Sequence, residues 1–149
     1  MKVEVKKVLV GSFDHSLDDK SRVFIPAKFR DDLGKQVVLV NGIGKCIYVF
    51  SVDGWNTFAG EFMQLSISNK VKRQLYASAD EREPDKQGRI VLSANLKKHA
   101  GIDTDVKIIG YQNKMEIWSK EEWEKYSADA DEEFDEKAME ILEGSGLGI

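Results

Sequence analysis

Two short stretches of this chain place an aspartate four residues before an arginine, at Asp18 and Arg22 and again at Asp85 and Arg89. The short carboxylate of an aspartate in a turn accepts hydrogen bonds from nearby backbone amides, so it can fix the shape of a loop. The planar guanidinium of an arginine can bind a phosphate, or the edge of a guanine, through two hydrogen bonds. We therefore interpret both stretches as loops that are shaped by aspartate and that bind nucleic acid through arginine.

Further basic residues stand within these loops or on the short helices predicted to follow them. Lysines and arginines that contact the phosphates of a duplex supply affinity that does not depend on base sequence. The residues expected to contact DNA are Arg22, Arg89, Lys20, Lys86, Lys28 and Arg30, with Lys97 and Lys98 as additional phosphate contacts, while Asp18 and Asp85 are expected to shape the loops.

A purely structural role is the alternative for these residues, in which each aspartate pairs with its arginine only to close a β-hairpin. A turn does favour residues such as Asp and Gly. It does not require an arginine at the same place in two separate copies, and for this reason we favour the DNA-binding interpretation.

The two loops belong to an internal repeat. Residues 18–34 and 85–101 carry like residue types over seventeen positions at a constant offset of 67 residues. A fixed offset over this length indicates two copies of one structural unit. The chain is therefore divided into repeat 1 over residues 12–54, a helical spacer over 55–78, repeat 2 over 79–122, and an acidic C-terminal helix and tail over 123–149.

Each copy is predicted to contain a β-hairpin around its Asp-x-x-x-Arg loop, then a short helix and a second β-hairpin. Alternating apolar residues indicate the strands, and an Asn-Gly pair marks the turn of the second hairpin in the first copy. Ser68 and the pair Ser119 and Glu122 are helix-capping signals. The predicted strands cover 11–17, 22–25, 37–40, 46–50, 89–92, 106–111 and 115–118, and the predicted helices cover 26–33, 52–65, 67–79, 93–100 and a segment that begins at 119.

The charge of the chain is unevenly distributed. The net charge is −4, but residues 119–149 hold three lysines against eleven acidic residues, a net of −8. Residues 1–118 hold the other 19 basic and 15 acidic residues, a net of +4. A basic body beside an acidic tail is consistent with a body that binds a polyanion, although a solvated acidic helix also accounts for the tail.

The chain lacks the residue groups that catalysis or metal binding would require. His15 and His99 are its only histidines, and neither has partners at metal-ligand spacing. Cys46 is expected to be a buried apolar residue. We expect no enzyme activity, no metal and no cofactor. The apolar runs are too short for a membrane span and the first residues lack a secretory pattern, so a cytoplasmic protein without membrane contact is expected.

The sequence resembles the MraZ family over nearly its whole length. The resemblance rests on Leu-Asp-Asp-Lys-Ser-Arg-Val-Phe-Ile-Pro-Ala-Lys-Phe-Arg in the first copy, and on Asp-Lys-Gln-Gly-Arg-Ile-Val-Leu and Lys-Met-Glu-Ile-Trp in the second. It implies an α+β fold in which two AbrB-like, β-hairpin-rich repeats form one pseudo-symmetric, β-barrel-like unit with peripheral helices. It also implies a DNA-binding transcriptional regulator of the bacterial division and cell-wall gene cluster, its own promoter included. Such a protein binds repeated promoter boxes in double-stranded DNA as a ring-shaped homo-oligomer associated with the nucleoid.

Three features depart from the family pattern. Ser93 stands where the second copy often keeps proline. Ser21 stands where the family usually has glycine, as Gly88 still does, and a serine with positive φ costs on the order of 1 kcal/mol. The first loop is therefore expected to differ slightly in shape and to bind DNA more weakly. About ten residues before Gly11 are additional, and they either extend a sheet edge or form an oligomer contact.

Two other classes of function compete with DNA binding. One is an antidote-like protein-interaction module of AbrB type that has no specific DNA binding. The other is a small hydrolase or transferase, although the sequence offers no pair of nucleophile and base for it.

Overall fold

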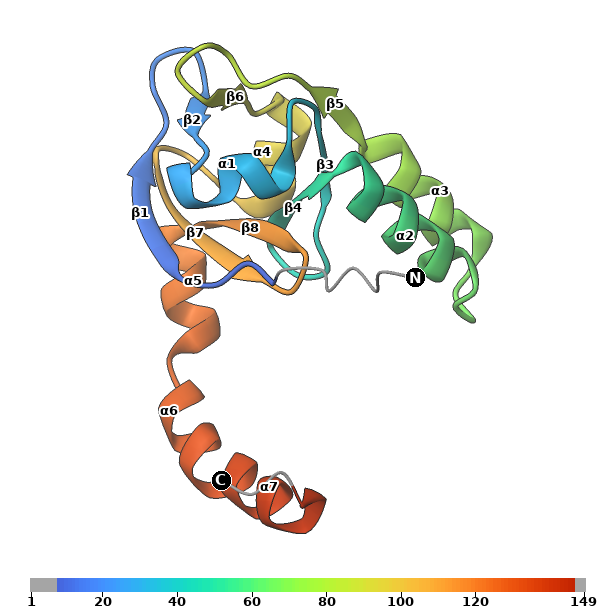
Figure 1. Cartoon of the computed structure of the whole chain (residues 1–149), viewed down its shortest axis with the longest axis vertical. Helices are drawn as coiled ribbons and strands as arrows, with labels where there is room; N and C mark the ends of the chain where they lie inside the picture. Colours follow the sequence, from blue (N-terminus) through green and yellow to red (C-terminus); the bar gives the residue numbers. More distant parts are fainter. Residues whose placement is uncertain (1–7, 147–149) are drawn as a thin grey trace, which may run out of the picture.

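The structure, a computed structural model, describes residues 8–146, apart from the side chains of residues 131 and 134. Its body combines a six-stranded sheet, a two-stranded sheet and packed helices, and a helical tail projects from it (Figure 1). The first half of the chain forms β1 (Ser12–Ser16), β2 (Arg22–Phe24), α1 (Ala27–Leu33), β3 (Val37–Asn41), β4 (Cys46–Ser51), α2 (Val52–Met63) and α3 (Asn69–Ser78). The second half forms β5 (Asp80–Arg82), β6 (Arg89–Val91), α4 (Ala94–Ala100), β7 (Asp105–Tyr111), β8 (Lys114–Ser119), α5 (Lys120–Ser127), α6 (Ala130–Glu133), the π-helical turn η1 (Phe134–Ala138) and α7 (Met139–Ser145).

The strands follow an approximate two-fold symmetry between the repeats. The large sheet is antiparallel, in the order β1-β7-β8-β4-β3-β5, and the small sheet pairs β2 with β6. Replacing each strand by its equivalent in the other repeat gives the same order read backwards. Each repeat therefore lends its first strand to the hairpin of the other, because β1 pairs with β7 and β5 pairs with β3.

The hairpin predicted around each Asp-x-x-x-Arg loop is wrong. The loop does turn the chain, since the Asp18 amide donates to the Arg22 carbonyl over 3.0 Å. The strands on its two sides then diverge, with β1 entering the large sheet and β2 pairing with β6. The physical reason is burial, because pairing β2 with β6 places Val23 and Ile90 directly opposite each other with almost no exposed surface.

The other predicted elements are confirmed with small shifts at their ends. β3 pairs with β4, and β7 pairs with β8, as antiparallel hairpins. The Ser68 hydroxyl accepts a hydrogen bond from the Val71 amide at the start of α3, and the Ser119 hydroxyl accepts one from the Glu122 amide at the start of α5. These capping bonds satisfy amides that a helix leaves without partners in its first turn.

Two apolar clusters lie on opposite faces of the large sheet. In β4 the side chains of Ile47 and Val49 enter the cluster beneath β2, β6, α1 and α4. Cys46, Tyr48 and Phe50 alternate with them and enter the cluster that α2, α3 and α5 cover. Strand β4 is apolar from Cys46 to Phe50, as expected for a strand that is covered on both faces. Burial raises the pKa of the Cys46 thiol to about 12, so the expected core role of Cys46 is confirmed.

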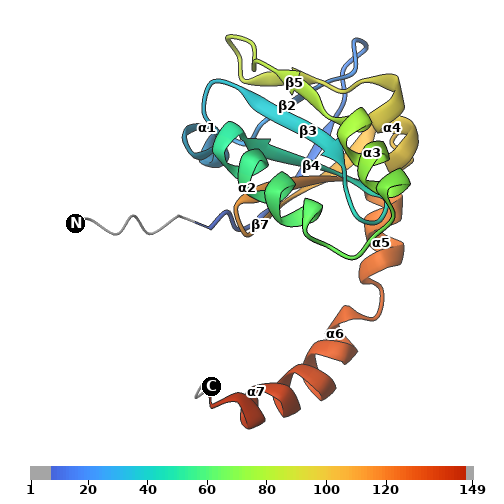
Figure 2. The same ribbon diagram turned by 90° about the vertical axis from the view of Figure 1, so that its right-hand side faces the viewer.

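The α+β class with antiparallel sheets is confirmed, whereas barrel-like closure is not. Between residues 8 and 146 the strands form two separate sheets, and no ring of hydrogen-bonded strands closes between them. Figure 1 shows β2 and β6 with their loops above β7 and β8, and Figure 2 shows α2 and α3 on the face turned towards the viewer, with the helical tail leading away below.

The residues just before β1 extend the edge of the large sheet. The Leu9 amide donates to the Gln112 carbonyl over 2.7 Å, and the Gly110 amide donates to the Gly11 carbonyl over 2.9 Å. Gly110 suits this contact because a Cβ there would lie 2.6 Å from the Leu9 carbonyl carbon. The prediction of a sheet-edge extension therefore holds for residues 9–11, and residues 1–7 lie outside the described part of the chain.

Candidate nucleic-acid interface

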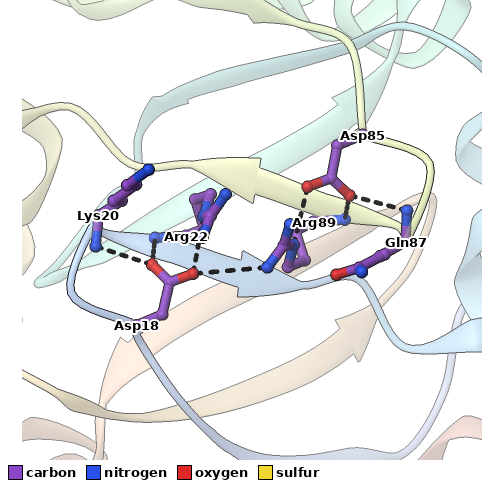
Figure 3. Close-up of polar contacts among 6 residues, drawn as sticks. All are labelled: Asp18, Lys20, Arg22, Asp85, Gln87 and Arg89. Atoms are coloured by element: carbon purple, nitrogen blue, oxygen red, sulfur yellow. Dashed lines mark hydrogen bonds and ion pairs between the residues drawn. The ribbon is translucent and has the colours of Figure 1, made fainter.

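The first loop is organised by the carboxylate of Asp18. One oxygen, Oδ1, accepts hydrogen bonds from the backbone amides of Lys20 and Arg22 over 3.0 and 2.9 Å. The other, Oδ2, accepts a 2.7 Å bond from Nε of the Arg22 side chain. The Asp18 carboxylate therefore bonds the backbone of the loop at two amides and also holds the arginine side chain (Figure 3).

The second loop repeats this arrangement around Asp85. Its Oδ1 accepts bonds from the amides of Gln87 and Arg89, both over 2.9 Å, and its Oδ2 accepts a 2.7 Å bond from Nε of Arg89. In both loops hydrogen bonds to the aspartate lower its pKa below the ordinary value. The largest of these effects comes from the backbone amide of the arginine, the next from its guanidinium, and the next from the second backbone amide. Both carboxylates are therefore ionised at neutral pH.

The two arginines lie on one outward face of the small sheet. Arg22 stands opposite Val91 in the register and Phe24 stands opposite Arg89, while Val23 and Ile90 point into the core. The Asp18 carboxylate lies 3.7 Å from the Arg89 guanidinium as well, so it connects the two loops. The Arg89 guanidinium is also 5.9 Å from the centroid of the Phe24 ring. We call the outward side chains of Arg22, Phe24, Arg89 and Val91 the ribbon face.

The ribbon face is partly open to solvent. The side chains of Arg22 and Arg89 are 26% and 21% exposed, so they lie against their aspartates instead of extending from the edge of the loop. Among the described residues, no carboxylate other than Asp18 lies within 4.0 Å of the Arg22 guanidinium. The Arg22 ion pair uses Nε, which leaves the terminal amino groups for other acceptors.

The purely structural alternative requires each aspartate to pair with its arginine, and both ion pairs are present. It also requires each pair to close a β-hairpin, and neither hairpin forms. Asp18 and Arg22 join strands of different sheets, and the same holds for Asp85 and Arg89. What the pairs achieve is a fixed position for two guanidinium groups on one surface.

The short helices hold the loops in two different ways. Lys97 at the end of α4 donates from Nζ to the Ser21 hydroxyl over 2.5 Å. Arg30, its equivalent in α1, donates from Nε to the Ile25 carbonyl and lies over Gly88, where a Cβ would be 2.5 Å from the Arg30 guanidinium carbon.

Ser21 has the positive φ expected at this position, 57°, and Gly88 has a φ of 84°. The turn bonds of the two loops nevertheless correspond, since the Ser21 and Gly88 amides donate to the Asp18 and Asp85 carbonyls over 3.1 and 2.9 Å. The turn bond is therefore kept with serine at this position, while the two φ angles differ.

The remaining predicted contact residues are less concentrated. Lys20 and Lys86 are exposed on the two loops. Arg30 and Lys86 line a shallow depression of about 440 Å³ beside the second loop, together with Lys35. Lys28 lies apart from it, with its Nζ 3.7 Å from the position of a Cβ on Gly11.

Two members of the ribbon face, Phe24 and Val91, are not among the predicted residues, and they are 41% and 38% exposed. The signal that could have identified them is the two-residue period of a strand, because each lies two residues after an arginine and therefore on the same side. No local signal predicts the contact of Lys97 with Ser21, because the two residues are 76 positions apart.

Residues 8–146 contain no group of three or more His, Cys, Asp or Glu side chains arranged to hold a metal ion. His99 has a structural role, since its Nε2 lies 3.0 and 2.9 Å from the carbonyl oxygens of Gly42 and Gly44. No helix between residues 8 and 146 combines the length and the apolar character that crossing a membrane requires.

Comparison with known proteins gives a consistent result. The family model described as "MraZ protein, putative antitoxin-like" matches residues 8–78 and again residues 75–143. The chain is 44% identical to the transcriptional regulator MraZ of Thermoanaerobacter sp. (strain X514) over 138 residues, which cover 90% of this chain and 96% of that protein. It is 40% identical to the transcriptional regulator MraZ of Alkaliphilus oremlandii over 146 residues, which cover 95% of this chain and 100% of that protein. With its two repeats matched and its relatives named as transcription regulators, this chain belongs to the MraZ family.

Proposed function

We propose that this chain regulates transcription by binding double-stranded DNA sequence-specifically through the ribbon face and its two loops. The observation that carries the proposal is the pair of aspartate-held arginines, Arg22 and Arg89, on one outward face of a two-stranded antiparallel ribbon. The major groove of B-form DNA, about 12 Å wide, admits such a ribbon. An arginine held through Nε can direct its terminal amino groups at the O6 and N7 acceptors of a guanine.

Side chains around the ribbon face would supply the contacts that do not read sequence. We propose that Lys20 and Lys86, which are exposed on the loops, contact phosphates on either side of the groove. Lys35 and Arg30 would add a phosphate contact at the edge of the depression that they line together with Glu83 and Asp85. Phe24 and Val91 belong to the ribbon face itself, and their apolar contact with thymine methyl groups would add to the reading of base sequence. Lys28 and Lys98 are assigned the outermost phosphate contacts.

The net charge of −4 has to be reconciled with binding to a polyanion. Self-association would overcome this unfavourable charge, because a ring-shaped homo-oligomer aligns several ribbon faces with consecutive promoter boxes. Linking weak sites raises overall affinity by large factors without any new contact. The acidic tail then lies away from the DNA, where its charge is screened over a distance of about 8 to 10 Å.

The genes regulated are proposed to be those of the bacterial division and cell-wall cluster, the chain's own gene among them, with the protein associated with the nucleoid. This assignment follows from membership of the family. Footprinting of the full-length protein on the DNA upstream of its own gene tests it. The expected result is protection of several short boxes at regular spacing. Uniform protection, or none at protein concentrations that shift other DNA, would contradict the proposal.

A further inference from the structure

We propose that the acidic C-terminal helix of one copy docks on the basic, apolar surface of α2 and α3 in a second copy, head to tail. The proposal deepens the self-association proposed above, on which it rests, and it does not depend on DNA binding. It commits to a second copy of this chain as the occupant of that surface.

The receiving surface is an exposed apolar patch around the turn between α2 and α3. Its large apolar side chains are 37% to 48% exposed, and between Met63 and Tyr76 lies a depression of about 380 Å³. Contiguous exposed apolar side chains on a soluble protein mark interaction sites. We call this set the α2–α3 surface, and it comprises Met63, Leu65, Ile67, Val71 and Tyr76.

Internal contacts hold the α2–α3 surface in a fixed shape. The Lys72 Nζ donates to the Met63 carbonyl over 2.9 Å and thereby ties α3 to the end of α2. The Tyr76 ring packs edge-on against Trp55, with 5.7 Å between ring centroids. A preformed surface binds without the entropic cost of ordering itself.

The tail carries an apolar stripe that, among residues 8–146, belongs to neither apolar cluster of the body. Figures 1 and 2 both show α6, η1 and α7 projecting from the body. Ala138, Ile141 and Leu142 lie within one turn on the same side of this helical segment. Ile141 is 70% exposed, and the half-buried side chains of Ala138 and Leu142 lie beside it.

The basic side of the α2–α3 surface is α3, and its charge is complementary to that of the tail, while α2 contributes the exposed Glu61. Residues 66–78 contain Lys70, Lys72 and Arg73 and no acidic residue, while residues 119–149 carry a net charge of −8. Arg73 and Lys72 line the depression itself. The tail has Glu140 and Glu143 beside Ile141, so an isoleucine seated in the depression would bring these carboxylates towards the two basic side chains. Complementary charges of this kind steer association and fix the register of an interface.

The two surfaces lie on different parts of the chain, so a docked pair still has one vacant tail and one vacant α2–α3 surface. A contact between unlike surfaces is heterologous, and repeated copies close into a ring or extend as a filament. The geometry of the contact is therefore of the type that ring assembly requires.

Sedimentation velocity of the full-length protein without DNA tests the proposal. Ile141→Arg damages the tail, Arg73→Glu damages the α2–α3 surface, and Ile43→Arg is a matched control at a 68% exposed isoleucine in the β3–β4 turn. We expect wild type and the Ile43→Arg protein to form the same oligomer, and each of the other two variants to need at least about tenfold higher concentration to assemble. Circular dichroism verifies that all variants are folded.

Mixing the two damaged variants provides the sharper result. The Arg73→Glu protein keeps its tail and the Ile141→Arg protein keeps its α2–α3 surface, so an equimolar mixture should give heterodimers and nothing larger. Both variants assembling like wild type would overturn the docking proposal and leave self-association and DNA binding intact. Wild type that stays monomeric would overturn self-association and docking together, and a DNA-binding measurement on that monomer would still be meaningful.

Discussion

The ammonium group of Lys97 donates a 2.5 Å hydrogen bond to the hydroxyl of Ser21 in the first loop. At the equivalent place in the second repeat, Gly88 has no side chain and the Arg30 guanidinium occupies the space above it. Each loop residue is thus matched to the basic residue of the helix that covers it, and that helix belongs to the other repeat. The two repeats therefore differ at both partners of this contact, which are serine and lysine at the first loop and glycine and arginine at the second.

Two substitutions of Ser21 distinguish the cost of its positive φ from the contribution of its hydrogen bond with Lys97 to stability. Ser21→Ala keeps the positive φ of 57° and loses the bond from Lys97, so we expect a loss of about 1 kcal/mol in the free energy of unfolding. Ser21→Gly loses the same bond but removes strain of about 1 kcal/mol, so its stability should be close to wild type. Chemical denaturation measures both, and Lys97→Met should abolish the difference between wild type and Ser21→Ala.

The stability lost on replacing Gly88 should depend on Arg30, whose guanidinium occupies the space above this glycine. In Gly88→Ala the new Cβ displaces Arg30 and breaks its bond to the Ile25 carbonyl, and the φ of 84° is unfavourable for alanine. We expect a loss of about 2 kcal/mol. In an Arg30→Ala background the same change should cost only the strain, about 1 kcal/mol. Equal losses in both backgrounds would mean that Arg30 does not fill this space.

The aspartates of the loops give a defined pH dependence of stability. Their folded-state pKa is lowered, so their contribution is fully present above the unfolded-state pKa, about 3.9, and is lost as the pH falls through the folded-state value. The Asp18→Asn, Asp85→Asn double variant should be less stable than wild type at pH 7. This difference in free energy of unfolding should narrow below about pH 4. A difference that stays constant from pH 7 to pH 3 would contradict the role of the carboxylates.

Cys46 should be protected from thiol reagents. Burial in the cluster beneath α2 and α5 raises its pKa to about 12, and the thiolate is the reactive form. Ellman's reagent at pH 8 should therefore react with one thiol per chain in denaturant and with almost none in the native protein. The rate of any native reaction should follow the rate of unfolding.

Local sequence determines the individual turns and caps of this fold but not the partners of its strands. The Asn41-Gly42 turn, the Ser68 cap and the Ser119 cap depend on neighbouring residues, and all were predictable. The hairpin predicted around Asp18 was wrong because turn-forming residues predict a reversal of the chain but not which strands pair on either side of it. Which strand pairs with β2 depends on burying Val23 against Ile90, 67 residues away.

The candidate site was predictable to a similar degree. The spacing of Asp18 and Arg22 predicts their pairing, because four residues around a turn bring the two side chains together. The approach of Arg89 to Asp18 depends on the exchange of strands between repeats, and no spacing reveals it. The contact of each loop with a helix of the other repeat has the same origin.

Binding of arginine variants to promoter DNA is the most direct test of the account. Fluorescence anisotropy at several salt concentrations would compare Arg22→Ala, Arg89→Ala and Arg82→Ala on the promoter fragment and on a scrambled fragment. Arg82 is the matched control, since it pairs with Asp80 in β5 and lies outside the ribbon face. Arg22→Lys would test whether binding needs two hydrogen bonds from the guanidinium, because lysine keeps the positive charge but cannot form such a pair of bonds.

We expect Arg22→Ala and Arg89→Ala each to lose about 1–3 kcal/mol of binding to the promoter, or roughly 5- to 150-fold in Kd, and much less on scrambled DNA. The loss should be smaller for Arg22→Ala if strain at Ser21 makes the first loop the weaker reader. Arg82→Ala should bind like wild type. Promoter binding by Arg22→Ala and Arg89→Ala that equals that of Arg82→Ala would contradict the assignment of the ribbon face to DNA.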